Sequence, residues 1–178
     1  NKMIYTNLER HGGNFLEILK REFQVSNNVT IASGYASLDI MEKFSEGFLK
    51  IAKRGGTSRL LLGMALYEGL SRKKLDLANT INEKLMKFSD KSGVFVTNGR
   101  RYHGKIYKFE TKKNHSIYVG SSNFSMSGTK GNIECTVSVH DQDQKILINN
   151  FLEDLYSKEF SVGIDKVDFL LVNRNHLM

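Results

Sequence analysis

Hydrophobic and polar positions follow two different periods along this chain. Apolar residues three and four apart, the spacing of one helical face, occupy four segments, and short apolar or alternating runs typical of strands lie between them. We therefore expect helices over residues 14–23, 38–54, 71–89 and 144–158, with Ser71 as an N-cap. The expected strands are 29–32, 59–66, 94–97, 102–109, 116–124 and 132–139.

The order of these elements predicts the fold class. Helices and strands alternate through the first hundred residues, and a group of strands then precedes the last helix, which favours an α/β fold with helices layered on a mixed β-sheet. Residues 59–66 form a continuous apolar run, as in a strand covered on both faces. The Gly, Ser and Asn clusters have no linker character, so we assign residues 1–178 to a single domain.

Composition changes this picture in three ways. The 26 Lys and Arg residues against 19 acids give a net charge of +7, which favours a polyanionic partner. No apolar run approaches the ~20 residues that span a bilayer. The single cysteine, Cys135, excludes an internal disulfide framework and fits a cytoplasmic protein; we expect it to be a small buried residue. The sequence opens without an initiator methionine, which suggests a fragment of a longer protein.

The segment 102–109 reads YHGKIYKF and carries two ionisable side chains in a strand-like pattern. Residues two apart on a strand point to the same face, so His103 and Lys105 should project together. A His-x-Lys pair by itself is more often a solvated strand face than a site. Its interpretation depends on the polar residues that neighbouring strands place beside it.

The next two predicted strands carry such residues. Gly120-Ser121-Ser122-Asn123 ends the strand 116–124; alone it reads as a β-turn, but hydroxyl and amide donors at a strand end also suit phosphate. In 132–139 the apolar residues alternate with polar ones, so Glu134 is the lone acid on a half-buried strand. If the three strands are neighbours, their polar faces bring together His103, Lys105, Asn123 and Glu134.

These residue types suit displacement at phosphorus. A neutral imidazole can attack phosphorus and form a covalent phosphohistidine, which splits one difficult step into two easier ones. Lysine neutralises the non-bridging oxygens, and Ser and Asn donors complete the cradle. A carboxylate that accepts the second ring N–H would fix the tautomer of the histidine.

The three motifs resemble those of the phospholipase D (PLD) superfamily, whose signature is His-x-Lys, an acidic residue five positions later, and Gly-Ser-x-Asn. Here they stand as His103-Gly104-Lys105 and Gly120-Ser121-Ser122-Asn123, with Glu134 eleven residues after the asparagine. Their order is most similar to the catalytic domains of metal-independent restriction endonucleases, and Ser33-Gly34-Tyr35 is similar to the opening of such domains. The motifs cover residues 94–140.

The resemblance implies a PLD-like fold and a prokaryotic cytoplasmic endonuclease that hydrolyses DNA through a phosphohistidine without metal or cofactor. It implies His103, Lys105, Asn123 and Glu134 as catalytic residues, with Lys105, Ser121 and Asn123 binding phosphate. One departure concerns Glu110, which stands where the family has Asp and is nine residues from Gly120 rather than about six, so we assign it no role. The longer hairpin TKKNH should expose a basic tip.

The chain holds one His-x-Lys, whereas the mechanism implied by the resemblance needs one histidine as nucleophile and one as acid. We therefore expect a homodimer with the site on its two-fold axis, and leave open which histidine is the nucleophile. Candidate DNA phosphate contacts flank the motif: Arg100, Arg101, Lys112 and Lys113. The remaining histidines, which have no metal-ligand spacing, should be surface residues: His11, His115, His140 and His176.

Two other function classes remain open. A phospholipase, phospholipid synthase or non-specific nuclease would share the fold, although the chain lacks an amphipathic or lipid anchor. A non-catalytic module could hold nucleic acid in the same phosphate cradle, although binding alone would not need a nucleophile. The recognition sequence cannot be read from these motifs, and we expect any DNA-recognition domain to lie outside this chain.

Overall fold

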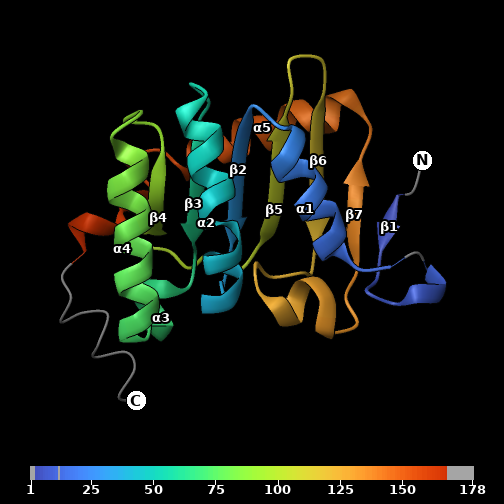
Figure 1. Cartoon of the computed structure of the whole chain (residues 1–178), viewed down its shortest axis with the longest axis horizontal. Helices are drawn as coiled ribbons and strands as arrows, with labels where there is room; N and C mark the ends of the chain where they lie inside the picture. The colour runs from blue at the N-terminus through green and yellow to red at the C-terminus, as the bar shows by residue number, and fades with distance from the viewer. Residues whose placement is uncertain (1–2, 12, 168–178) are drawn as a thin grey trace.

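The computed structural model describes residues 3–11 and 13–167, which form one eight-stranded sheet with helices on both faces (Figure 1). The helices are α1 (Phe15–Val25), α2 (Leu38–Lys53), α3 (Ala65–Glu68), α4 (Arg72–Met86) and α5 (Gln142–Leu155). The strands are β1 (Ile4–Tyr5), β2 (Asn28–Ser33), β3 (Ser58–Leu62), β4 (Gly93–Thr97), β5 (Lys105–Glu110), β6 (His115–Gly120), β7 (Thr136–Val139) and β8 (Ser161–Gly163). Short helical turns are η1 (Glu9–His11), η2 (Ser127–Gly131) and η3 (Ile164–Lys166).

The sheet is mixed, as the sequence predicts. The strand order is β1-β7-β6-β5-β2-β3-β4-β8, with β2, β3 and β4 parallel and every other neighbouring pair antiparallel. The parallel strands are joined through α2 and α4, because parallel neighbours need a crossover connection. The later strands follow one another as antiparallel neighbours, which brings the three motif segments side by side.

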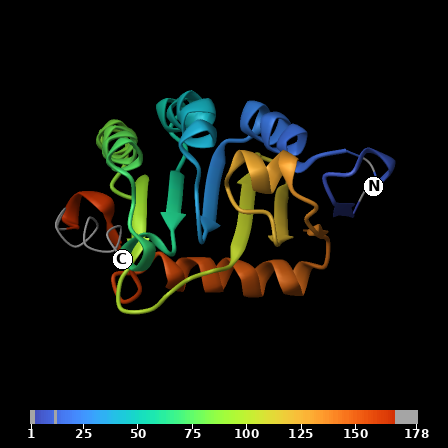
Figure 2. The same ribbon diagram turned by 90° about the horizontal axis from the view of Figure 1, so that it is seen from below.

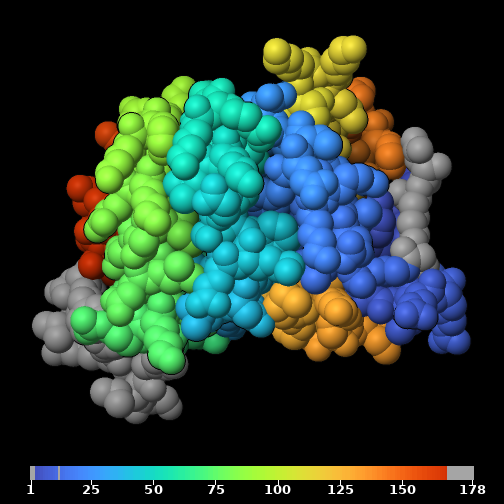
Figure 3. All heavy atoms as spheres, viewed as in Figure 1, coloured from blue at the N-terminus to red at the C-terminus, as the bar shows by residue number. Residues whose placement is uncertain are grey.

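The helices form two unequal layers. Figure 2 shows α1, α2 and α4 on one face of the sheet and α5 alone on the other, and Figure 3 shows the three helices side by side over the first face. The larger core lies under these three helices and includes Phe15, Phe48, Tyr107 and Phe124. A smaller core lies between the sheet and α5, where Ile106, Leu152 and Leu155 meet.

Polar side chains fix where the predicted helices begin. Asn14, Ser71 and Asp141 each accept a hydrogen bond from a backbone N–H in the first turn of α1, α4 and α5. Ser71 is thus the N-cap expected from the sequence. The four predicted helices are confirmed, with no end shifted by more than three residues.

Four predicted strands are too long. The strand 59–66 ends at Leu62, because the N–H groups of Gly63 and Met64 donate to Ser33 and Gly34 and the chain turns into α3. The strand 102–109 begins only at Lys105, 116–124 ends at Gly120, and 132–139 begins at Thr136. Two short edge strands, β1 and β8, were not predicted, because neither has an apolar pattern long enough to detect.

The burial expected for 132–139 is partly wrong. Cys135 is exposed rather than buried, and Ile133 exposes 75% of its surface, because both precede the strand. Thr136 is fully buried instead, where its hydroxyl bonds that of Ser122 at 2.6 Å. The surface positions expected for His11, His115 and His140 are confirmed, because all three are exposed. The fourth, His176, lies outside the described residues.

Within residues 3–11 and 13–167, no helix is both long and apolar enough to cross a membrane.

Candidate active site

The strand ends that carry the motifs meet at one edge of the sheet. Ser33 at the end of β2 pairs with Lys105 at the start of β5, and Gly120 at the end of β6 pairs with Thr136 at the start of β7. Since Ile106 pairs with Val119, these two pairs are neighbours on adjoining strands. The edge therefore collects the loop before β5, the turn after β6 and the segment before β7.

His103 and Lys105 do come together, although His103 lies in the loop before β5 rather than on the strand. The Lys105 side chain is buried and curls back, so that its Nζ donates to the His103 carbonyl oxygen at 2.5 Å. The same Nζ lies 3.2 Å from Nδ1 and 3.5 Å from Nε2 of the imidazole. The imidazole itself is on an exposed residue, so a substrate can reach it.

Burial and a nearby acid act on the Lys105 ammonium in opposite directions. Burial lowers the pKa of Lys105 below its ordinary value, and the charge of Glu134 partly offsets that effect. Glu134 thus acts electrostatically on the same site without touching the lysine.

Ser121 and Glu134 form the second contact in the site. The Ser121 hydroxyl donates to Glu134, and Asn132 Nδ2 donates to the other carboxylate oxygen at 3.4 Å. Ser121 Oγ also accepts from the Cys135 N–H at 2.9 Å. Within the described part of the chain no hydrogen bond joins Glu134 to His103, so the carboxylate here positions the Gly-Ser-x-Asn turn rather than the imidazole.

Asn123 lies in a turn that is held by hydrogen bonds from buried residues on either side of it in the sequence. Tyr107 donates its hydroxyl to the Ser122 carbonyl at 2.8 Å, and the Phe124 N–H donates to Ser33 Oγ at 3.0 Å. Asn123 Oδ1 is buried and has no hydrogen-bond partner among the described residues. A buried carbonyl oxygen without a donor is costly, so Asn123 Oδ1 can accept a hydrogen bond from a group supplied from outside.

Two residues beside His103 were not assigned a role by the sequence. A Cβ on Gly34 would lie 3.2 Å from His103 Cδ2 and 3.3 Å from His103 Cα, so the loop packs directly on this glycine. The Tyr35 ring meets the imidazole edge-on with 5.5 Å between centroids, and its hydroxyl donates to Glu68. The Ser-Gly-Tyr sequence at the end of β2 was the only signal, and it gave no role for either residue.

Comparison with known families identifies the family of this chain. The family model described as the NgoFVII restriction endonuclease N-terminal PLD domain matches residues 14–168. The chain belongs to this family. It is therefore a PLD-superfamily phosphodiesterase of the nuclease type, as the motifs indicated. No curated protein sequence matches the chain.

Solved structures show the same fold. Nuc from Salmonella typhimurium, a phospholipase D family member, is 16% identical, with a TM-score of 0.58 over 85% of this chain and 88% of that one. NucT from Helicobacter pylori is 13% identical, with a TM-score of 0.59 over 90% of this chain and 96% of that one. The polyphosphate kinase from Porphyromonas gingivalis is 12% identical, with a TM-score of 0.58, and matches 96% of this chain but 24% of its own.

The basic residues that flank the motif in sequence lie in two different places in the PLD domain. Arg100 and Arg101 precede His103 in the same loop and line a groove of about 400 Å³ with Tyr102 and Phe151. Lys112 and Lys113 are exposed at the turn between β5 and β6, at the opposite edge of the sheet. The basic hairpin tip is confirmed, but it is not beside His103.

Glu110 also lies at that opposite edge. It pairs with Asn28 and His115 in the sheet, and its carboxylate contacts Lys108 at 3.2 Å and His115 at 3.5 Å. β5 contains six residues from Lys105 to Glu110, a separation of roughly 17 Å along the strand. Glu110 therefore lies away from the edge where the motif residues gather.

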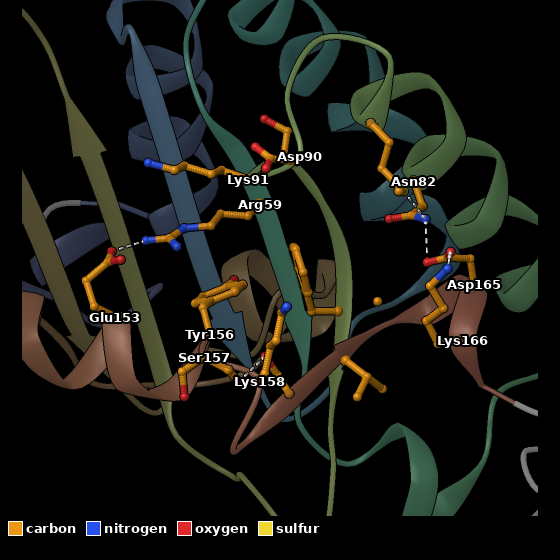
Figure 4. Close-up of a pocket in the computed structure, with 16 residues that line it drawn as sticks. Arg59, Asn82, Asp90, Lys91, Glu153, Tyr156, Ser157, Lys158, Asp165 and Lys166 are labelled. Carbon is orange, nitrogen blue, oxygen red and sulfur yellow. Dashed lines mark hydrogen bonds and ion pairs between the residues drawn. The ribbon is translucent and has the colours of Figure 1, made fainter.

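A larger pocket, of about 650 Å³, lies away from the motif residues of the PLD domain. It is bounded by α4, β4, β8 and the end of α5 (Figure 4). Arg59 stacks over the Tyr156 ring at 4.4 Å and pairs with Glu153 there. None of the residues predicted for catalysis lines this pocket, so its size alone would give a misleading location for the site.

Proposed function

We propose that this chain is the catalytic domain of a metal-independent restriction endonuclease that cleaves DNA through a covalent phosphohistidine. The observation that supports it most directly is the exposed His103 imidazole held against the Lys105 ammonium at the edge where the other motif residues gather. A neutral imidazole has one ring nitrogen with a free lone pair. That is the form of histidine that can attack phosphorus.

The first step forms the bond from a His103 ring nitrogen to phosphorus and breaks the bond from phosphorus to the leaving oxygen. Lys105 neutralises the non-bridging oxygens, and Ser121 and Asn123 contribute polar contacts beside them. The leaving oxygen takes a proton from a second, protonated histidine. In the second step water attacks the phosphohistidine while that second histidine accepts its proton, which restores both side chains.

The second histidine comes from a twin subunit in this proposal. The described loops beside His103 contribute Tyr35, Gly34 and Tyr102 but no other histidine. A homodimer with a two-fold axis at the site supplies it, because the same patch then serves both subunits. We do not assign which of the two histidines is the nucleophile.

We further propose that Arg100 and Arg101 contact DNA phosphates close to the cleaved bond. Lys112 and Lys113 would contact DNA only at a distance from it, since they lie at the opposite edge of the sheet. The matched family is described as an N-terminal PLD domain. That description supports a separate recognition domain in the whole enzyme and, with a restriction function, a prokaryotic cytoplasmic location.

Within the described residues, no three His, Cys, Asp or Glu side chains cluster as metal ligands, and the metal independence of the reaction stays a proposal. Plasmid cleavage in excess EDTA tests this. Wild type should cleave, His103→Ala should lose at least about 10³-fold in rate but still shift DNA in a gel, and His115→Ala should cleave normally. His115 is an exposed histidine at the far edge and serves as the matched control.

Other outcomes would decide for other functions. Strict dependence on Mg²⁺ would exclude the phosphohistidine route. DNA binding without cleavage in wild type would indicate a binding module. Hydrolysis of phosphatidylcholine vesicles in preference to DNA would indicate a phospholipase that shares the fold.

A further inference from the structure

A small pocket, of about 190 Å³, lies at the edge of the sheet where β2 and β3 end. Its walls come from residues 34–36 after β2, from parts of residues 62–70 around α3, and from Lys74 in the first turn of α4. Figure 1 shows α3 and the start of α4 together at this edge. Pockets that hold a drug-sized molecule measure about 300–1,000 Å³, so this one suits a smaller group, such as one ring system.

The pocket shares a wall with the candidate active site. Gly34 and Tyr35 line it, and both adjoin His103. A Cβ on Gly34 would lie 3.2 Å from His103 Cδ2, and the Tyr35 ring centroid is 5.5 Å from that of the imidazole. Ala36, which also lines the pocket, pairs with Phe124 next to the Gly-Ser-x-Asn turn. A substrate with its phosphate at the imidazole therefore has neighbouring groups within reach of the pocket.

The floor of this pocket is apolar. Four buried side chains form it: Leu62, Met64, Ala65 and Leu70. Burial of apolar surface is favourable, so such a floor favours a ligand with a flat, weakly hydrated face. A nucleobase has such a face, and enzymes that take up a single base hold it between aromatic and apolar side chains.

Two side chains of opposite charge line the same pocket. Glu68 accepts a hydrogen bond from the Tyr35 hydroxyl, and Lys74 Nζ donates to the Ala36 carbonyl at 3.2 Å. In the described part of the chain no ion pair joins Glu68 to Lys74. A carboxylate has further lone pairs and an ammonium has three N–H donors, so each can make another hydrogen bond. The pocket thus offers one acceptor and one donor to the edge of a ligand.

The loop that carries the imidazole also brings a cation to α3. The Arg101 guanidinium lies over the Tyr67 ring at 5.0 Å, and Tyr67 precedes Glu68 in α3. Arg101 and Lys74 together outweigh the charge of Glu68, so a ligand that carries phosphate is attracted to this neighbourhood. A DNA strand held by Arg101 would pass beside the pocket.

We propose that this pocket takes a base of the cut DNA strand, next to the phosphate at His103. The inference rests on the proposed function, which places that phosphate at the imidazole. Cytosine presents an amino donor beside ring acceptors, which match Glu68 and Lys74, and carboxylates accept from this amino group in DNA readout. Thymine has a carbonyl oxygen in its place, and two acceptors that face each other repel. In a duplex the base must leave the stack, as it does in enzymes that act on one base.

Calorimetric titration with mononucleotides tests the pocket without requiring cleavage. Deoxycytidine monophosphate should bind wild type at least about fivefold more tightly than thymidine monophosphate or inorganic phosphate. The 3′- and 5′-monophosphates are both titrated, because they place the base on different sides of the phosphate. Glu68→Gln puts an amide donor at the carboxylate and should reduce the preference for cytosine over thymine to less than about twofold. Glu83→Gln, at an exposed position of α4 outside the pocket, is the matched control and should keep the preference.

Nucleotides that bind wild type no more tightly than inorganic phosphate, or a cytosine preference that survives Glu68→Gln, would overturn the base pocket. Plasmid cleavage in EDTA, measured on the same samples, separates this result from failure of the proposed function. Cleavage by a protein without base preference would refute the pocket alone. A cytosine preference in a protein that never cleaves DNA would support the pocket and refute the nuclease mechanism.

Discussion

The Lys105 ammonium donates to the carbonyl oxygen of His103 at 2.5 Å and lies 3.2 Å from Nδ1 of the same residue. Lys105 therefore fixes the backbone that carries the imidazole and also faces its ring. The contact connects phosphate binding and nucleophile orientation through one side chain.

Lys105→Met should lower the rate of DNA cleavage by about 10²-fold or more, because it removes both the phosphate-neutralising charge and the bond to His103. The same substitution should not lower the free energy of unfolding to a similar extent. Methionine has a similar length and bears no charge, so the burial that lowers the pKa of Lys105 no longer opposes folding. Lys113→Met, at the exposed hairpin tip, is the control and should change neither property.

The same substitution predicts a pH dependence of stability. Because the pKa of Lys105 is lower in the folded state, the unfolded chain holds this proton more tightly. The wild-type free energy of unfolding therefore gains from Lys105 as pH rises through the alkaline range up to the ordinary lysine pKa of 10.5. Urea denaturation at several pH values should show the advantage of Lys105→Met largest at neutral pH and smaller at alkaline pH. An advantage that grows with pH would contradict the burial argument.

Gly34→Ala should impair cleavage without unfolding the protein. The new Cβ would lie 3.2 Å from His103 Cδ2 and 3.3 Å from His103 Cα, so the loop must shift by a few tenths of an ångström or more. Misplacement of a nucleophile on that scale costs about 10-fold to 10²-fold in rate. Gly131→Ala is the control, since its Cβ would meet nothing nearer than 4.0 Å. Equal activity of the two variants would show that the position of the loop is not critical.

The four longest helices and the strands that carry the motifs could be predicted because each has a clear apolar period or run. The edge strands β1 and β8 could not, since two and three residues give no detectable period. The extent of β5 was misjudged because YHGK alternates like a strand, whereas the loop at 101–104 is held by hydrogen bonds to distant residues. The Tyr102 N–H donates to Gly63 and the Gly34 N–H to Gly104.

The candidate site shows the same division. His103, Lys105, Ser121 and Glu134 could be selected from motif spacing, but the pairing of Ser121 with Glu134 depends on the register between β6 and β7. Tyr35 was missed as a neighbour of His103 because contact between residues so far apart in sequence depends on the pairing of β2 with β5. Local pattern identifies the reactive residue types, and tertiary pairing decides which of them touch.

Removal of the hydroxyl group should have different effects on the free energy of unfolding at Tyr102 and at Tyr107. Tyr102 Oη is buried without a hydrogen-bond partner among the described residues, and burial raises the pKa of Tyr102. Tyr102→Phe should therefore be neutral or stabilising, by up to about 1 kcal/mol. Tyr107 donates to the Ser122 carbonyl at 2.8 Å, so Tyr107→Phe should cost about 1 kcal/mol and loosen the Asn123 turn. Chemical denaturation of the pair checks this, and a larger loss for Tyr102→Phe would contradict it.

The Tyr35 ring should position His103 through its edge-on contact at 5.5 Å rather than through its hydroxyl. Aromatic pairs of this geometry contribute about 0.5–1.5 kcal/mol, so Tyr35→Leu should lower kcat by roughly two- to tenfold with little change in KM. Tyr35→Phe keeps the ring contact and should retain most of the activity. A large loss of activity in Tyr35→Phe would contradict a role for the ring alone.

The hydroxyl of Tyr35 provides an independent check on this geometry. Its hydrogen bond to Glu68 is the main cause that raises the pKa of Tyr35. In Glu68→Gln that pKa should fall, so Tyr35 should ionise at lower pH, visible as a difference between the ultraviolet titration curves of the two proteins. Cleavage by Glu68→Gln should stay within about threefold of wild type, because the ring still faces His103. A loss as large as that of Tyr35→Leu would mean that the hydroxyl contact, and not the ring, holds the imidazole.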